Sequence, residues 1–331
     1  VGEEMQSAKF GLTLSNRSVV LGLSDVGEML QLAKAADEAK VWDSVWLGDS
    51  IIAKPRLDVM VALGGLAAVT SRVKLGVGCM ASAPLRDALL MAYQWASFDF
   101  MCGGRSIYVA CQGQREAGGG QFAEEFAAFG VDPATRSKRM EESIEVMRLI
   151  SQQESASYHG EFNQFENVTI QPRPIQQPLP IWVTANPNPE FPKLRASALK
   201  RVALLGDGWM TTANTVESLQ ENFDDIKRYA DEAGRELPED FEVCLYYNIR
   251  VGTDREKTVR ESSEYLKAYY GVEYPRDFLD RWVAMGDAQR CIDEIGKFVE
   301  AGATTITLRL VGHDEAEQFE RVTQDVLGAF A

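Results

Sequence analysis

Short runs of apolar residues, many of them β-branched, alternate along the chain with longer segments in which apolar residues recur every three or four positions. The short runs predict buried strands, and the longer segments predict amphipathic helices that pack against them. The predicted strands are residues 10–15, 44–47, 73–79, 106–111, 180–185, 208–211, 242–251 and 304–309. The predicted helices are residues 26–39, 57–70, 86–100, 136–152, 194–205, 216–233, 287–301 and 315–330.

A helix follows each of the eight predicted strands, and this count decides the fold. Eight strand-helix units close a barrel, whereas open doubly wound sheets usually have about five to seven strands. We therefore predict an α/β fold, a (β/α)8 TIM barrel with insertions at its C-terminal face, as a single domain over residues 1–331. A chain of this length can form one barrel of this class.

Two segments depart from the repeat and are expected to be insertions. Residues 158–174 predict a β-hairpin, and residues 253–285 predict an acidic, tyrosine-rich helical insertion after the seventh strand. Long insertions at the C-terminal face of a barrel usually cover its active site. A contact between subunits is the other interpretation of the second segment.

Charge and cysteine content exclude several classes of partner. The net charge of −15 repels phosphate backbones and anionic lipids, so we expect no nucleic-acid or membrane partner. The five cysteines form no CxxC pair, which favours reduced thiols. We find neither a signal-peptide pattern nor an apolar run near ~18 residues, and so expect a cytoplasmic protein.

Ligand-binding groups in such a barrel come from the carboxyl ends of the strands, which here are small, polar and glycine-rich. The chain has only two histidines: His159, expected in a surface turn, and His313, which follows the last strand. We therefore expect no metal site, because side chains that bind metals or transfer protons are scarce. An organic cofactor would supply the missing reactivity.

Several segments at these strand ends resemble one known family. They read FDFMCGGRSIYVACQG at 98–113, FGVDPATRSKRMEESIEVMRLI at 129–150, PIWVTA at 180–185 and GDGWM at 206–210. Together with 63–78 and 158–174, they are similar to the luciferase-like flavin monooxygenases. This family includes bacterial luciferase and the oxidoreductases that use the deazaflavin coenzyme F420, and the likeness covers nearly the whole chain.

The resemblance implies where a flavin would bind. In the family the ring lies against the end of the third strand, where a non-proline cis peptide maps to Gly78–Cys79. Cys111 falls where the catalytic subunit of bacterial luciferase has a reactive cysteine, and Ser50 where many members have a proton-transfer histidine, so both are candidate catalytic residues. The implied cofactor contacts are Gly78, Cys79, Met80, Cys111, Gln112, Gly113, Ala185, Asn186, Asp207, Gly208 and Trp209.

Three departures from the family pattern bear on catalysis and on phosphate binding. Serine at position 50 cannot act as a base at neutral pH, and Gln112 stands where luciferase has a phosphate-contacting arginine. A substitute cation could come from Arg115, Arg139 or Lys193. Prolines at 187 and 189 have no N–H to donate where many members bind phosphate through the backbone.

The resemblance implies an FMN-dependent monooxygenase that takes reduced flavin from a separate reductase and oxygenates a small, largely apolar organic substrate. One alternative is an F420-dependent oxidoreductase that transfers hydride, and another is a non-catalytic flavin-binding or partner subunit. Family dimers suggest a homodimer through the helices at 57–70 and 86–100. The candidate pocket walls are Phe10, Met80, Trp209, Tyr246, Tyr269 and Tyr270.

Overall fold

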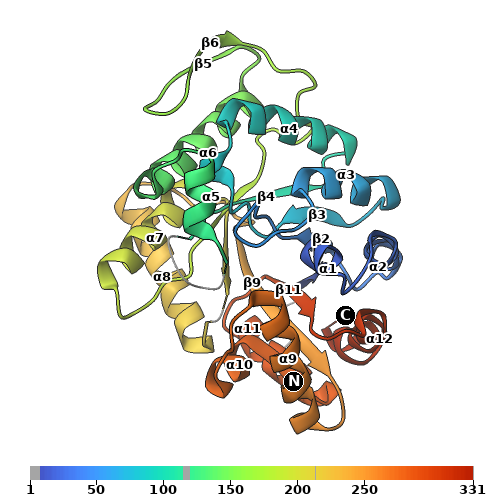
Figure 1. The fold of residues 1–331 in the computed structure, drawn as a ribbon. Coiled ribbons are helices and arrows are strands. Elements are labelled where there is room, and N and C mark those ends of the chain that lie inside the picture. The colour runs from blue at the N-terminus through green and yellow to red at the C-terminus, as the bar shows by residue number, and fades with distance from the viewer. Residues whose placement is uncertain (1–7, 115–119, 213, 331) are drawn as a thin grey trace.

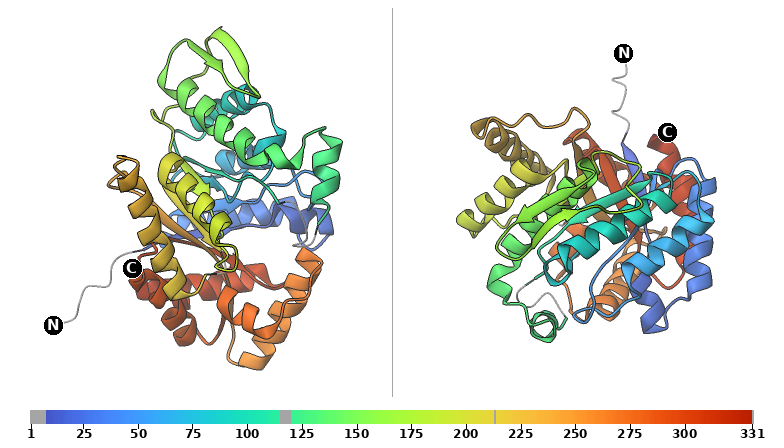
Figure 2. Two further views of the ribbon diagram at one scale, coloured as in Figure 1. Left: turned by 90° about the vertical axis from the view of Figure 1, so that its left-hand side faces the viewer. Right: turned by 90° about the horizontal axis from the view of Figure 1, so that it is seen from above.

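Eight parallel strands close into a barrel with helices around its outside in the computed structural model, which describes residues 8–114, 120–212 and 214–330 (Figures 1 and 2). Around the barrel the order is β9, β11, β1, β2, β3, β4, β7 and β8, and pairing of β8 with β9 closes the ring. The predicted (β/α)8 barrel is thus confirmed. Its strands are β1 (Lys9–Thr13), β2 (Ser44–Leu47), β3 (Lys74–Val77), β4 (Ser106–Ala110), β7 (Ile181–Thr184), β8 (Gly208–Thr212), β9 (Glu242–Val251) and β11 (Thr305–Leu310).

The helices between the strands lie close to their predicted positions. Aspartate or threonine caps the amino ends of most of the longer ones through a side-chain hydrogen bond, as at Asp25, Asp58 and Thr215. Two short helices, α1 (Asn16–Leu21) and α5 (Phe122–Ala128), were not predicted. The others are α2 (Val26–Glu38), α3 (Val59–Val69), α4 (Ala88–Met101), α6 (Arg136–Gln152), α7 (Pro192–Leu205), α8 (Val216–Glu232), α11 (Ala288–Glu300) and α12 (Glu315–Arg321).

The carboxyl-terminal segment is less regular than predicted. The helix expected over 315–330 is α-helical only to Arg321, and it continues as a π-helical turn over Val322–Val326 and a 3-10 turn over Leu327–Phe330. None of the helices in the described ranges is long and apolar enough to cross a membrane.

The two predicted insertions lie at opposite ends of the molecule (Figure 1). The hairpin forms from β5 (Ala156–His159) and β6 (Gln164–Val168), and it projects away from the mouth of the barrel. The insertion after β9 contains α9 (Arg255–Tyr270) and α10 (Arg276–Trp282). Its last part is wrongly predicted as helical, because β10 (Val283–Gly286) pairs with the second half of β9 as a ninth strand. β10 follows α10 directly, with no turn residues between them, so the sequence pattern predicted a continued helix instead of a short strand.

Two tryptophans fill the inside of the barrel. The rings of Trp46 and Trp182 lie 5.5 Å apart between their centroids, and Met210 packs in the same buried cluster. Glycines on neighbouring strands make room for them: a Cβ at Gly76 would overlap the Trp46 ring, and a Cβ at Gly208 would lie 2.6 Å from the Trp182 ring. The interior is thus closed by packed side chains, which leaves the mouth as the place for a ligand.

We predict that Gly76→Ala destabilises the protein by about 1–3 kcal/mol, because the new methyl group must displace the Trp46 ring in a packed interior. Gly64→Ala is the matched control, since a Cβ at Gly64 in α3 would have no atom within 4 Å and alanine favours a helix. Urea denaturation of both variants measures the two free energies of unfolding. Equal stabilities would contradict this account of the core.

Candidate active site

A cavity of about 370 Å³ lies at the carboxyl ends of the strands, which is the size range of small-molecule sites. It combines a wall of small residues with a wall of aromatic and cationic side chains. A second groove, of about 560 Å³, runs between α6 and α7 on the outside of the barrel and shares no lining residue with this cavity. The cavity is lined by Gly48, Asp49, Lys54, Arg56, Gly78, Cys79, Gln114, Thr184, Asn186, Met210, Thr211, Thr212, Tyr246, Tyr269, Tyr270, Tyr274, Phe278, Trp282 and Arg309.

Three of the predicted cofactor contacts line this cavity: Gly78, Cys79 and Asn186. The Gly78–Cys79 peptide bond is cis, as the resemblance implied. Tyr246, Tyr269 and Tyr270 also line the cavity, as expected of pocket walls. Gly78, Cys79 and Asn186 reach the mouth because they follow the ends of β3 and β7. Tyr246 of β9 pairs with Thr212 at the end of β8, and Tyr269 and Tyr270 are the last residues of α9.

Other predicted contacts lie just behind the cavity wall. Met80 is fully buried and pairs with Ala110, while Ala185 is buried and accepts a hydrogen bond from the Trp209 indole at 2.9 Å. Gln112 turns away, because its side chain accepts a hydrogen bond from the Ser137 hydroxyl. Gly113 has a φ of +66°, and a Cβ there would lie 2.9 Å from the Ala81 oxygen, so the turn requires glycine.

The prediction for Asp207, Gly208 and Trp209 needs correction, because they lie at the other end of the barrel or face away from its mouth. β8 begins at Gly208, so Asp207 stands at its amino end, where it accepts a hydrogen bond from Arg148 at 2.8 Å. Trp209 is fully buried in the core. The same strand contributes to the cavity through Met210, Thr211 and Thr212 instead.

Ser50 also departs from its predicted catalytic role, because it holds its own loop together. Its hydroxyl accepts a hydrogen bond from the Lys54 N–H at 2.9 Å and donates to the Glu125 carboxylate at 3.4 Å. The same carboxylate accepts backbone N–H groups of Ile51 and Ala53. Ser50 is absent from the cavity lining, so we replace the catalytic assignment with a structural one.

The remaining candidate cations and histidines lie away from the cavity. Lys193 borders the outer groove, and the Arg139 guanidinium stacks on Phe162 at 4.2 Å. His159 is exposed in the hairpin, and His313 is exposed with its ring packed on Tyr265. Arg115 falls outside the described residues. Among the residues that the structure describes, no group of three or more His, Cys, Asp and Glu side chains could hold a metal ion.

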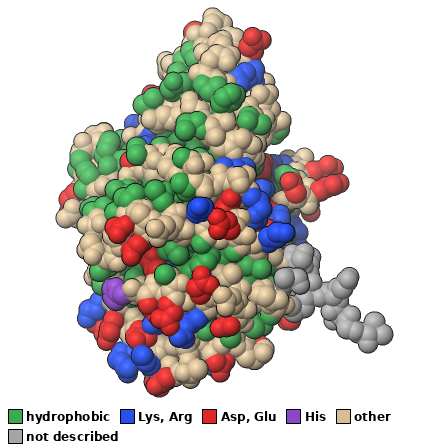
Figure 3. Space-filling view, turned by 90° about the vertical axis from the view of Figure 1, so that its right-hand side faces the viewer, with side chains coloured by type: hydrophobic (Ala, Val, Ile, Leu, Met, Phe, Trp, Pro, Cys, Tyr) green, Lys and Arg blue, Asp and Glu red, His purple; other side chains and the backbone are tan. Residues whose placement is uncertain are grey.

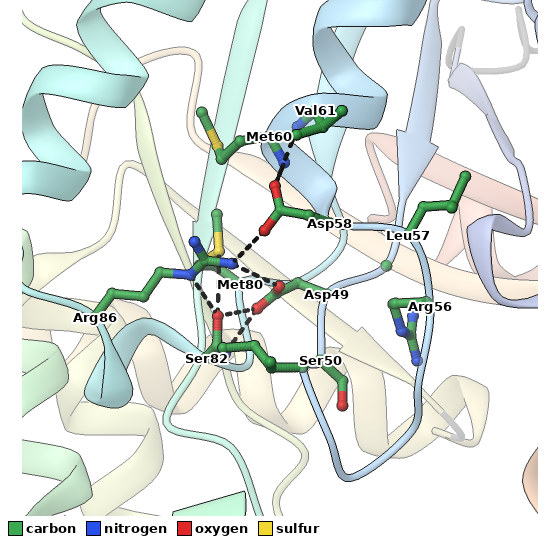
Figure 4. A network of polar contacts seen from close by, with 12 residues as sticks. Asp49, Ser50, Arg56, Leu57, Asp58, Met60, Val61, Met80, Ser82 and Arg86 are labelled. Atoms are coloured by element: carbon green, nitrogen blue, oxygen red, sulfur yellow. Dashed lines mark hydrogen bonds and ion pairs between the residues drawn. The ribbon is translucent and has the colours of Figure 1, made fainter. Parts of the chain in front are cut away.

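A network of charged groups fixes the loop after β2 against the turn after β3 (Figure 4). Asp49 accepts hydrogen bonds from the Ser82 N–H at 2.7 Å and the Ser82 hydroxyl at 2.6 Å. Arg86 reaches Asp49 at 3.4 Å and Asp58 at 3.2 Å. Because the Asp49 side chain is only 2% exposed, these partners compensate its burial and hold the adjacent cavity wall in place.

Cys111, the other predicted catalytic residue, lies beside Cys79 on the neighbouring strand. A hydrogen bond from the Cys79 thiol lowers the pKa of the Cys111 thiol to about 7, aided by Thr184 and the Gly113 N–H and opposed by burial. The same contact, with burial, raises the pKa of Cys79 well above its usual value. A neighbouring thiol, rather than a cation, therefore stabilises the Cys111 thiolate.

Sequence reasoning missed the cations of the cavity: Lys54, Arg56 and Arg309. Arg309 comes near the end of the eighth predicted strand, which is a signal for a site residue. Lys54 and Arg56 lie in the long loop after β2, where the sequence gives no spacing that distinguishes them from ordinary surface cations.

We predict that iodoacetamide alkylates Cys111 with a rate that rises through pH 7, because only the thiolate reacts. Cys79→Ala should move the midpoint toward the ordinary thiol pKa of ~8.5 and slow the reaction at pH 7 about tenfold. Cys79→Ser should largely keep the midpoint, since a hydroxyl can still donate. Peptide mapping by mass spectrometry measures each site. An unchanged midpoint in Cys79→Ala would refute the thiol contact.

Comparison with known proteins identifies the family. The model of the luciferase-like monooxygenases matches residues 8–305. An uncharacterized Mycobacterium bovis protein is 28% identical over 242 residues, covering 67% of this chain and 77% of that protein. The F420-dependent glucose-6-phosphate dehydrogenase of Kineococcus radiotolerans is 22% identical over 91% of this chain and 92% of its own. The monooxygenase RslO1 from Streptomyces bottropensis superposes with a TM-score of 0.77 at 20% identity, covering 98% and 100% of the two chains. This chain belongs to the luciferase-like monooxygenase family of oxidoreductases.

Proposed function

We propose that this oxidoreductase is an FMN-dependent monooxygenase that takes reduced FMN from a separate flavin reductase and oxygenates a small organic substrate. The observation that carries the proposal is the two-sided cavity. A low wall formed by Gly78, Cys79 and Thr184 faces an aromatic wall that includes Tyr246 and Trp282. A planar ring and an organic substrate can lie side by side between such walls.

The low wall suits a flavin ring because its side chains are absent or small. Gly78 has none, and Cys79 and Thr184 project little, so a planar group can approach the backbone. Asn186 accepts the Thr212 N–H through Oδ1 at 2.9 Å, which leaves its Nδ2 group available to the polar tail of the cofactor. When bound, reduced FMN would supply the electrons that activate O₂ for transfer of one oxygen atom to the substrate.

The protein's own contribution is to exclude water and to orient the substrate. The insertion covers the cavity through Tyr270, Tyr274 and Trp282, whose rings pack on one another at 5.2 to 6.0 Å. A hydrogen bond of 2.7 Å from the Trp282 indole to the Thr212 hydroxyl fastens the insertion to β8. A closed, apolar cover protects reactive oxygen species from solvent.

A charged residue, Arg250, holds the other end of the insertion. Arg250, near the end of β9, bonds Glu261 of α9 at 2.7 Å and Asp314 after β11 at 2.7 Å. Only 9% of its side chain is exposed, so the two carboxylates together compensate the burial of its charge. The cover is thus held to two strands of the barrel.

A homodimer is part of the proposal. Outward-facing apolar residues gather on α3 and α4, the helices that we expected at a subunit contact: Val61 is 76% exposed, Leu90 53%, Phe100 56% and Met101 67%. Figure 3 shows hydrophobic side chains concentrated on the upper part of the face that carries these helices. Exposed apolar patches of this kind commonly mark protein interfaces.

An F420-dependent hydride-transfer enzyme is the second candidate. The relative that matches over 91% of the chain is an F420-dependent dehydrogenase, and this favours the alternative. The low wall would accept a deazaflavin ring as readily as a flavin ring, because the two rings share their planar shape. The chemistry of the cofactor, rather than that of the wall, separates these two functions.

We predict that the protein binds reduced FMN and consumes oxygen when a flavin reductase and NADH regenerate it. Tyr274→Ala should release more hydrogen peroxide per oxygen consumed, because the cover over the cavity is opened. Oxygen electrode traces with and without catalase measure both quantities, and Arg321→Met on the exposed face of α12 is the control. Preferential F420 binding would favour hydride transfer, and binding of neither cofactor would favour a partner subunit.

A further inference from the structure

We propose that Arg309, together with Arg56 and Lys54, binds an oxyanion group on the organic substrate, so that the preferred substrates are organic anions such as carboxylates or phosphate esters. We call these three residues the anion corner. The inference deepens the proposed function, because it assigns a substrate class to the same cavity. It changes the expected substrate from a largely apolar molecule to one with an apolar body and one charged end.

Arg309 carries the argument because it is a buried cation without a protein anion. Its side chain is 4% exposed and lines the cavity. Nη1 donates to the Tyr270 hydroxyl at 2.9 Å, while Nε has no hydrogen-bond partner. Among the described residues, no carboxylate lies within the 4.0 Å of an ion pair. A buried charge left unpaired is costly, whereas a guanidinium with unused donors can hold an oxyanion through two hydrogen bonds.

The surroundings hold the guanidinium without neutralising it. Its carbon lies 4.3 Å from the centre of the Tyr269 ring and 5.4 Å from that of Tyr246. Such contacts between a cation and aromatic faces favour the charged form but leave the edge of the guanidinium open to a ligand. The site therefore keeps a full positive charge in the cavity wall.

Other cations add to this charge. Burial, together with the like charges of Arg56, Arg17 and Arg309, lowers the pKa of Lys54 to about 8. Lys54 also lies 4.7 Å from the centre of the Tyr270 ring. In a chain with a net charge of −15, several cations meet at one cavity. A bound anion would relieve their mutual repulsion.

Two carboxylates of the described residues, Asp49 and Glu315, do not neutralise Arg309. Asp49 lines the cavity but is occupied by Ser82 and Arg86. Glu315 lies 3.4 Å from the Tyr265 hydroxyl, and burial raises its pKa to about 7, which reduces its negative charge near neutral pH. Neither forms an ion pair with Arg309.

The place of the anion corner in the barrel favours the substrate over the cofactor as the source of the oxyanion. β11, which carries Arg309, is four strands away from β4 in either direction around the eight-stranded ring. It therefore stands across the mouth from the low wall proposed for the flavin. Figure 4 shows Arg56 on the loop after β2, and its side chain lines the same cavity. The apolar body of the substrate would lie against Tyr274, Phe278 and Trp282.

Binding of a matched pair of probes tests the proposal without any flavin chemistry. We expect the protein, either alone or with oxidised FMN, to bind 3-phenylpropanoate about tenfold or more tightly than the neutral 3-phenylpropanamide. Calorimetry measures both affinities. Arg309→Met should remove this preference while retaining binding of the amide. The control Arg321→Met, which removes an exposed cation that pairs with Glu317, should keep it.

Further variants and ligands distinguish binding of the substrate from binding of the cofactor phosphate. Arg56→Gln should reduce the preference several-fold, and it serves as the test if Arg309→Met does not fold by circular dichroism. Affinities for FMN and riboflavin should fall by the same factor, or not at all, in Arg309→Met. A loss confined to FMN would assign the corner to the cofactor phosphate and overturn the proposal, as would equal binding of acid and amide by the unmodified protein. Absence of oxygen consumption would count against the monooxygenase but not against the anion preference.

Discussion

The packing of Trp46 and Trp182 inside the barrel is the constraint on which the rest of the structure depends. Their rings fill the space below the strand ends, and glycines on adjacent strands provide the room that they need. A ligand is thereby confined to the carboxyl-terminal mouth. Because all eight strands are parallel, side chains that are far apart in sequence converge there.

The mouth is organised by charges whose burial is compensated to different degrees. Asp49 and Arg250 each have protein partners, and they fix the cavity wall and the insertion that covers it. Arg309 has no protein anion among the residues described. This difference between Arg309 and the other two buried charges is the basis for proposing that it binds an anionic ligand.

The two walls of the cavity differ in the kind of group that each can bind. The low wall at β3 and β7 offers close approach to the backbone, and the wall at β9 and β11 offers aromatic faces and positive charge. The Cys79–Cys111 pair stands at the end of the low wall, where a thiolate near neutral pH would lie close to the proposed ring. A site of this kind binds and orients, and it leaves electron transfer to the cofactor.

The sequence by itself determined the barrel, most of its longer helices and the family, because apolar periodicity and local segments are sufficient for these. It also placed Gly78, Cys79 and Asn186 at the cavity, since strand direction alone identifies which residues end at the mouth. The same rule argues against Asp207, which precedes its strand, so that error came from a short motif rather than from the pattern.

Only the tertiary structure decided which side chains meet. Ser50 is bound by Glu125, 75 residues away, and Arg309 stacks on tyrosines of an insertion about 40 residues before it. Such pairs depend on barrel closure, on strand register and on how the insertion folds over the mouth, none of which a residue pattern encodes. That Arg309 has no carboxylate partner in the described part of the chain is likewise a property of the assembled cavity, because the sequence does not show which side chains surround an arginine.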